Sequence, residues 1–177
     1  IGLEAINSTN DLSSVIIDKT APVVTASISS NNTINTLAKE GDIVTLNIAS
    51  NELLHAAPTI TIDGNPATPN PTTASANYTA TRTMVAGDGQ TVIPFLVTKE
   101  TLIDRAGNGP SEDLTSTNDA SSVTFDTTIP TITGLTIGSN NTLDPTLAKP
   151  GDVVTIEFFT SEKVQEPVAK IVTENAL

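Results

Sequence analysis

Short segments of the chain alternate between apolar and polar residues, and turn-forming residues separate them. In 43–50, for example, Val44, Leu46 and Ile48 share one face while Thr45 lies on the other. A period of two residues is typical of antiparallel strands with one buried face. We therefore predict about seven strands in a sandwich-sized stretch of chain. Six of them are delimited by the pattern: 22–28, 43–50, 59–63, 76–84, 91–98 and 121–126.

The same alternation assigns inward positions to the later strands. These positions are Tyr78, Ala80 and Met84 in 76–84, and Ile93, Phe95 and Val97 in 91–98. Pro94 cannot donate a ladder hydrogen bond, so we expect part of 91–98 at an edge or a bulge. The pairs Asp63-Gly64 and Asn65-Pro66 predict a turn after 59–63.

The sequence also repeats itself. Residues 8–22 (STNDLSSVIIDKTAP) recur as 116–130 (STNDASSVTFDTTIP) at an offset of 108, and 30–52 recur as 139–162 at offsets of 109 and then 110. Two loops are thus expected to have gained one residue each. A period near 110 residues is the size of a sandwich domain and far exceeds that of a solenoid repeat.

Composition narrows the function classes. The 177 residues carry a formal charge of −12, which repels phosphate backbones and anionic headgroups, so we expect no nucleic-acid partner and favour cations. Aromatic residues make up 3%, with no Trp, so a rich ligand pocket is not expected. The absence of Cys excludes disulfides and thiolate metal sites. No apolar run approaches the roughly 18 residues that span a bilayer, so we expect no membrane insertion of this segment.

Four short motifs occur in a fixed order: D-x-T-x-P, AK-x-GD-x-VT, S-x-E and D-x-AGN. In this sequence they are Asp18, Thr20 and Pro22; Ala38, Lys39, Gly41, Asp42, Val44 and Thr45; Ser50 and Glu52; and Asp104, Ala106, Gly107 and Asn108. Together with the second copy, they resemble the bacterial immunoglobulin-like tandem repeats of large surface adhesins and extracellular fibre proteins, over essentially the whole chain. The resemblance implies an extracellular or cell-surface array of β-sandwiches that acts as a stalk or spacer, often with calcium at its junctions. Several members of the family carry more Asp at the junctions than this chain does.

On this basis we predict an all-β fold of immunoglobulin-like β-sandwich repeats in tandem, one complete and two partial. Residues 1–17 are assigned to the end of a preceding repeat, 18–125 to a complete repeat and 126–177 to the first part of the next. The two partial repeats together supply 69 of the 108 positions of a repeat and lack its fifth and sixth strands. We therefore expect the chain to belong to a longer tandem array, with neighbouring repeats as its main partners, in preference to a subunit completed by its own copies.

The predicted strand order places the acidic loop residues at two poles. Asp18, Glu52, Asp104 and Asn108 converge at the entry of the complete repeat, and the equivalent junction of the next repeat uses Asp126 and Glu162. Carboxylate and amide oxygens are the ligands that Ca²⁺ prefers, so these six residues are the candidate metal ligands. Turn capping by Asp and Asn, with Glu52 as a solvated charge, is the alternative reading. Asp42, Asp63 and Asp88 are expected at the opposite pole, where they could serve the following junction.

The residues do not indicate an enzyme. His55 is the single histidine, there is no Cys, and the Ser residues are scattered through turns. Arg82 is expected to extend from a sheet margin with its charge in water. Non-catalytic alternatives stay open: a module that binds glycan or another surface through loops or rows of Thr, and a subunit of a laterally assembled filament or surface layer. The loop 57–77 lacks an aromatic residue, which favours the spacer.

Overall fold

The computed structural model describes residue 11 and residues 13–171. Its chain divides into two compact units, Ile1–Thr127 and Thr128–Leu177, called here the first and second unit. The fold is nearly all β, as predicted, and the one helical turn in the described part is the 3-10 helix η1, Lys99–Thr101. Within these residues no helix has the length and apolarity to cross a membrane. The assignment of residues 1–17 to a preceding repeat stays a prediction, and 1–10 and 12 lie outside the described residues.

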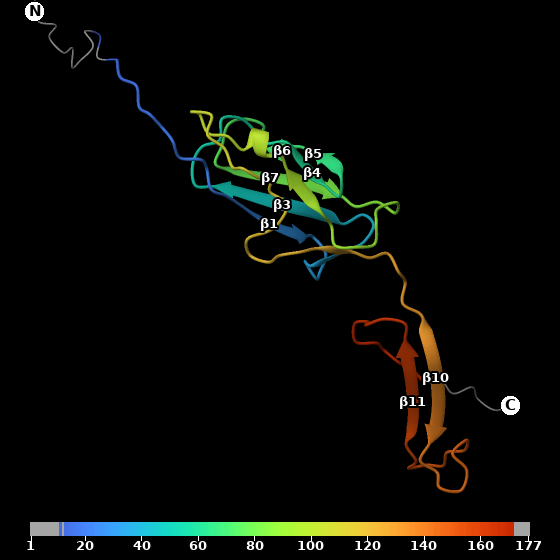
Figure 1. Cartoon of the computed structure of the whole chain (residues 1–177). Helices are drawn as coiled ribbons and strands as arrows, with labels where there is room; N and C mark the ends of the chain where they lie inside the picture. Colours follow the sequence, from blue (N-terminus) through green and yellow to red (C-terminus); the bar gives the residue numbers. More distant parts are fainter. Residues whose placement is uncertain (1–10, 12, 172–177) are drawn as a thin grey trace, which may run out of the picture. The chain divides into compact units, whose positions relative to one another are not determined.

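The first unit is built on a four-stranded antiparallel sheet (Figure 1). Its strands, in spatial order, are β1 (Val24–Ser30), β3 (Ile43–Ser50), β7 (Asn77–Thr83) and β6 (Pro69–Asn70). In β3 the alternate residues Val44, Leu46 and Ile48 are each at most 2% exposed, which confirms their predicted inward direction.

A second, three-stranded sheet faces the first. It contains β5 (Asn65–Ala67), β4 (Ile60–Ile62) and β8 (Phe95–Val97), in that order. A short parallel pair, β2 (Leu37–Ala38) with β9 (Thr124–Phe125), completes the unit. The stretch 65–70, which the sequence assigned to a loop, instead forms the edge strands β5 and β6. Residues 91–98 are interrupted at Pro94 as expected, because Pro94 precedes β8 and its carbonyl accepts from the N–H of Asp63 (2.7 Å).

One apolar core lies between the two sheets. All the residues predicted to point inward in 76–84 and 91–98 are buried in it. Tyr78 is the largest of the fully buried side chains, and its hydroxyl accepts from the N–H of Ser75 (2.7 Å) and lies 3.0 and 3.1 Å from the carbonyl oxygens of Thr73 and Ala56. The one polar group of this ring is therefore satisfied, as burial requires.

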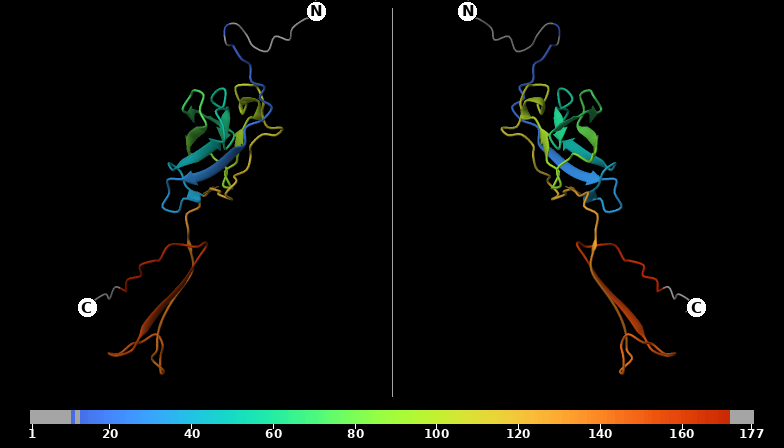
Figure 2. Two further views of the ribbon diagram at one scale, coloured as in Figure 1. Left: turned by 90° about the vertical axis from the view of Figure 1, so that its left-hand side faces the viewer. Right: turned by 90° about the vertical axis from the view of Figure 1, so that its right-hand side faces the viewer.

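The described strands of the second unit form one antiparallel hairpin, β10 (Ile132–Ser139) with β11 (Val154–Thr160), which lie side by side in Figures 1 and 2. This hairpin is the counterpart of β1–β3. A register shift between Ile132 and Gly134 leaves Thr133 as an extra residue. The first of the two insertions in the repeat is therefore a bulge within a strand and not, as expected, an enlarged loop.

The turns of the two hairpins use the same hydrogen bonds. Asn31 Oδ1 accepts from the N–H of Ile43 (2.7 Å), and Asn140 Oδ1 accepts from the N–H of Val153 (2.9 Å). A carboxylate then closes each turn: Asp42 accepts from the N–H of Lys39, and its counterpart Asp152 accepts from that of Lys149, both at 2.9 Å. Gly41 and Gly151 occupy the left-handed region, with φ of 87° and 96°.

Candidate metal centre

Asp104 anchors the candidate site because its loop folds around its own carboxylate. Oδ1 accepts from the backbone N–H groups of Ala106 and Asn108 (2.8 Å each), and Oδ2 accepts from Nδ2 of Asn108 (2.9 Å). Gly107, at φ 90°, permits the tight turn, and Asp104 is 2% exposed. The amide of Asn108, assisted by these backbone donors, holds the pKa of Asp104 below its ordinary 3.8 despite desolvation, so the group is a fixed anion at neutral pH.

Glu52 approaches from the loop after β3. Its neighbour Asn51 fixes this loop to the start of the sandwich, since Asn51 Oδ1 accepts from the N–H of Val23 (2.8 Å) and the N–H of Asn51 donates to the carbonyl of Val23 (3.1 Å). Glu52 is half-buried. Loss of water, followed by the negative charges of Asp104 and Asp18, raises its pKa above the ordinary 4.5.

Asp18 belongs to the chain that enters the first unit. Its Oδ1 caps the turn ahead by accepting from the N–H of Thr20 (3.0 Å), and its carbonyl accepts from Nδ2 of Asn108 (3.3 Å). The exposed carboxylate of Asp18 thus lies where the entering chain meets the loop of Asp104.

These three acidic residues converge. Asp18, Glu52 and Asp104 each place a carboxylate oxygen within 4.8 Å of the other two, so together they could hold a metal ion. Asn108 braces two of them through its amide NH₂. Hard oxygens from three carboxylates suit Ca²⁺ better than transition metals, which favour nitrogen or sulfur. Asp18 and Asp104 cap turns and also converge with Glu52, so both geometries that the sequence suggested occur together; that this cluster binds an ion stays a prediction.

The two residues of the second predicted metal site, Asp126 and Glu162, lie in different units of the chain. Asp126 follows β9, and its N–H donates to the carbonyl of Ala38 (2.9 Å). Glu162 follows β11, and its buried Oε1 has no hydrogen-bond partner among the described residues. Asp126 belongs to the first unit and Glu162 to the second, so their pairing stays a prediction.

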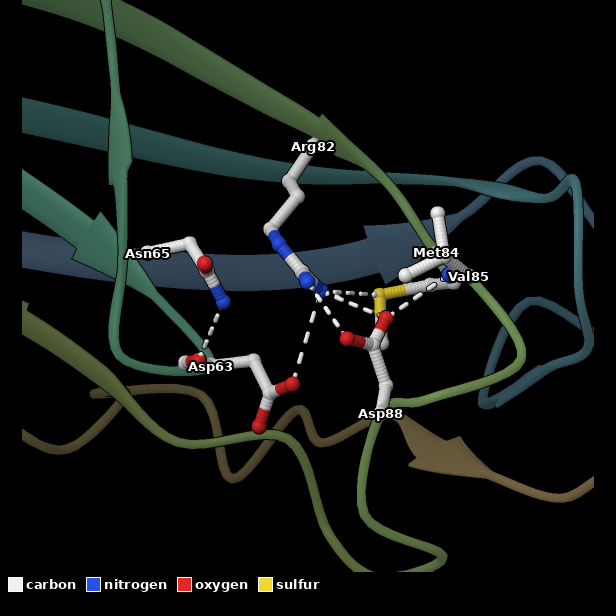
Figure 3. Close-up of polar contacts among 6 residues, drawn as sticks. All are labelled: Asp63, Asn65, Arg82, Met84, Val85 and Asp88. Carbon is white, nitrogen blue, oxygen red and sulfur yellow. Dashed lines mark hydrogen bonds and ion pairs between the residues drawn. The ribbon is translucent and has the colours of Figure 1, made fainter.

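Arg82 departs from its predicted place in water. Its guanidinium pairs with both oxygens of Asp88 (2.8 and 2.5 Å) and lies 3.4 Å from Oδ2 of Asp63 (Figure 3). The Arg82 side chain is 12% exposed and that of Asp88 7%. The expectation that Asp63, Asp88 and Asp42 serve a following junction finds no support in these contacts, since each carboxylate already accepts bonds within the unit. For Asp42 the donors are Nδ2 of Asn32 (2.7 Å) and the N–H of Lys39.

The sequence reasoning missed two residues that cover the outer edge of β1. Asn118 Oδ1 accepts from the N–H of Ala26, and Ser121 Oγ accepts from the N–H of Ile28, both at 2.9 Å; the N–H of Asn118 returns a bond to the carbonyl of Ala26 (3.1 Å). Their signal was available, because both belong to the repeated STND-x-SS motif.

No protein-family model, curated protein or solved structure matches this chain.

Proposed function

We propose that the chain is a structural, non-catalytic segment of an extracellular fibre or adhesin stalk built from tandem immunoglobulin-like repeats. The observation that carries the proposal is the recurrence of one hairpin, with the same turn bonds, in both copies of the sequence repeat. Repeated modules joined in series hold a distal part of the same protein away from the cell. The net charge of −12 keeps such modules soluble and separate.

Calcium is the proposed stiffening ion at the entry of the first unit. Ca²⁺ takes six to eight oxygen ligands, and Asp18, Glu52 and Asp104 supply carboxylates from three segments of the chain. When bound, the ion supplies positive charge that offsets their repulsion. The protein's own residues hold the junction in place. The backbone N–H groups of its loop fix the carboxylate of Asp104, and the carbonyl of Asp18 accepts from Asn108, which joins the entering chain to the sandwich.

A groove on the outer face of the four-stranded sheet bears on the glycan-binding alternative. Asn47, Asn77, Asn118 and Thr79 are among the polar side chains that line it. Tyr78, its one aromatic residue, is 2% exposed, so its ring offers no platform on which a sugar could stack. This favours the spacer.

Thermal unfolding with calcium and with a chelator tests the ion. The wild-type chain should gain about 10 °C in Tm at a hundredfold excess of free calcium over its dissociation constant. Asp18→Asn should lose most of this gain, because it removes an exposed ligand charge without touching the core. Glu112→Gln, an equal charge change at another exposed position, should keep it. A wild-type chain that melts identically in calcium and chelator contradicts the calcium site.

The raised pKa of Glu52 gives a pH test of the same site. Protons compete with calcium for this carboxylate, so calorimetric affinity should fall as pH is lowered toward the raised pKa, beginning above 4.5. In Glu52→Gln the affinity should be lower at neutral pH and the fall should be shallower over that range. An affinity that is unchanged by the substitution at every pH removes Glu52 from the ligand set.

A further inference from the structure

The outer face of the hairpin changes in kind between the two copies of the repeat, whereas the turn bonds do not. In the first unit, the facing pairs of β1 and β3 on this face have small uncharged side chains: Thr25–Ala49, Ser27–Asn47 and Ser29–Thr45. The register of β10 and β11 places other residues at the same positions: Gly134–Phe159, Thr136–Glu157 and Gly138–Thr155. The second hairpin therefore has an aromatic ring, a carboxylate and two glycines that the first lacks.

The outward direction of these positions is established by the first unit, in which the sandwich is closed. There Asn47 and Ala49 are exposed although β7 is paired beside β3. A groove on this face, lined in part by Ser27, Asn47 and Ala49, is also open in the closed sandwich. Phe159, which is 70% exposed, and Glu157 thus face solvent because of their place in the repeat.

Phe159 is positioned by the backbone opposite it. Its Cδ2 lies 3.2 Å from the point that a Cβ of residue 134 would occupy, so the ring uses space that Gly134 leaves free. Gly134 directly follows the bulge at Thr133. Bulges often re-aim side chains beside functional sites, and a glycine within a strand often marks a close approach of another group.

Glu157 lies two residues before Phe159 on the same face of β11, so their Cα atoms are roughly 7 Å apart. It lines an open groove with Thr136, Gly138 and Thr155, and no other charged side chain lines that groove. Its carboxylate forms no hydrogen bond or ion pair with another described residue. An aromatic ring attracts a cation through its quadrupole, and a nearby carboxylate adds a full opposite charge.

We propose that this face of the second repeat binds a Lys side chain of a partner protein, with the ammonium group between the Phe159 ring and the Glu157 carboxylate. Charge complementarity favours this partner, because the chain carries a net charge of −12 and attracts basic surfaces. The open groove does not enclose a small free ligand, which favours a side chain that projects from a larger surface. The inference goes beyond the stalk role and is independent of calcium.

An NMR titration of the full chain in chelator, with two peptides, tests the proposal. One peptide is acetyl-Gly-Lys-Gly-amide; in the other the lysine Nζ is acetylated, which removes the charge and keeps the stem. The charged peptide should shift the amides of Glu157 and Phe159, and the neutral peptide should not. Phe159→Leu should weaken binding about threefold, since it removes the ring and keeps an apolar side chain.

Glu157→Gln should also weaken binding, because it removes the charge beside the ring. Glu166→Gln is the matched control, since it makes the same charge change at an exposed position outside the groove. Both glutamates are exposed, so neither change should affect folding, and the remaining amide signals check this.

Three results would overturn the proposal. Equal shifts with the two peptides would mean that the groove does not recognise the charge. Equal weakening by Glu157→Gln and Glu166→Gln would mean that the acidic chain attracts the peptide without a specific site. Unchanged amides of Glu157 and Phe159 at every peptide concentration would mean that this face does not bind lysine. The calcium melting test is unaffected by any of these results.

Discussion

The hairpins β1–β3 and β10–β11 share their turn bonds and most of their register, yet their inner faces differ in burial. Leu46 is 0% exposed in β3, whereas its counterpart Ile156 in β11 is only partly buried. The polar residues that make the shared turn bonds are local in sequence, so each hairpin contains the donors and acceptors of those bonds. The first turn has two further backbone bonds, to Met84 beyond the end of β7. Burial of the inner face depends instead on β4, β7, β8 and β9, which are distant in sequence. Hairpin geometry and core formation are therefore separately specified in this repeat.

The largest expected effect comes from truncating the inner face. Leu46→Ala should lower the free energy of unfolding of the first unit by about 2–5 kcal/mol, because it leaves a cavity in a closed core. Ile156→Ala should cost the second hairpin less than about 1 kcal/mol, since that side chain already contacts water. Tyr78 is the single tyrosine and reports denaturant unfolding of the first unit by fluorescence; amide exchange in β10 reports on the second. Equal costs at the two positions would contradict the difference in burial.

An intermediate effect should come from the ion pairs. Asp88→Asn should cost the first unit about 1–3 kcal/mol, because it weakens a nearly buried bidentate pair with Arg82. The hydrogen bond from Arg82 holds the pKa of Asp88 below 3.8, so its contribution is present above that pH and is lost as pH falls through the lowered pKa. The variant should show less acid destabilisation than wild type in denaturant titrations.

Lys149→Gln, at the exposed pair with Asp152, should change the stability of the second hairpin by less than about 1 kcal/mol.

The smallest loss of folding stability is expected from the turn glycines, and it should be equal in the two hairpins. Gly41→Ala and Gly151→Ala each place a side chain in the left-handed region, and a Cβ at either position meets no atom within 4 Å. Each substitution should therefore lower the free energy of unfolding by about 1 kcal/mol through backbone strain alone. Amide exchange in β3 and β11 should report similar losses. A cost found in one hairpin alone would mean that the turn depends on its surroundings.

Local patterns predicted the parts of the fold that depend on local chemistry. Alternation identified the long strands and the inward side chains of β3 and β7, and the order of the loops predicted that Asp18, Glu52 and Asp104 would meet. The bulge at Thr133 was placed in a loop because an insertion in sequence does not reveal which strand residue loses its partner. Arg82 was misjudged because Asp63 and Asp88 reach it from two turns whose approach is set by tertiary packing. The short pair β2–β9 has too few residues to show a period.

Hydrogen exchange at Leu46 and Ile156 in dilute solution tests most directly the claim that, among the described residues, the inner face of β1–β3 is covered and that of β10–β11 is less so. We expect the amide of Leu46 to exchange only through global unfolding of the first unit, and that of Ile156 to exchange orders of magnitude faster. Matching protection at both amides would contradict this difference, because it would mean that the second hairpin has a closed core of its own.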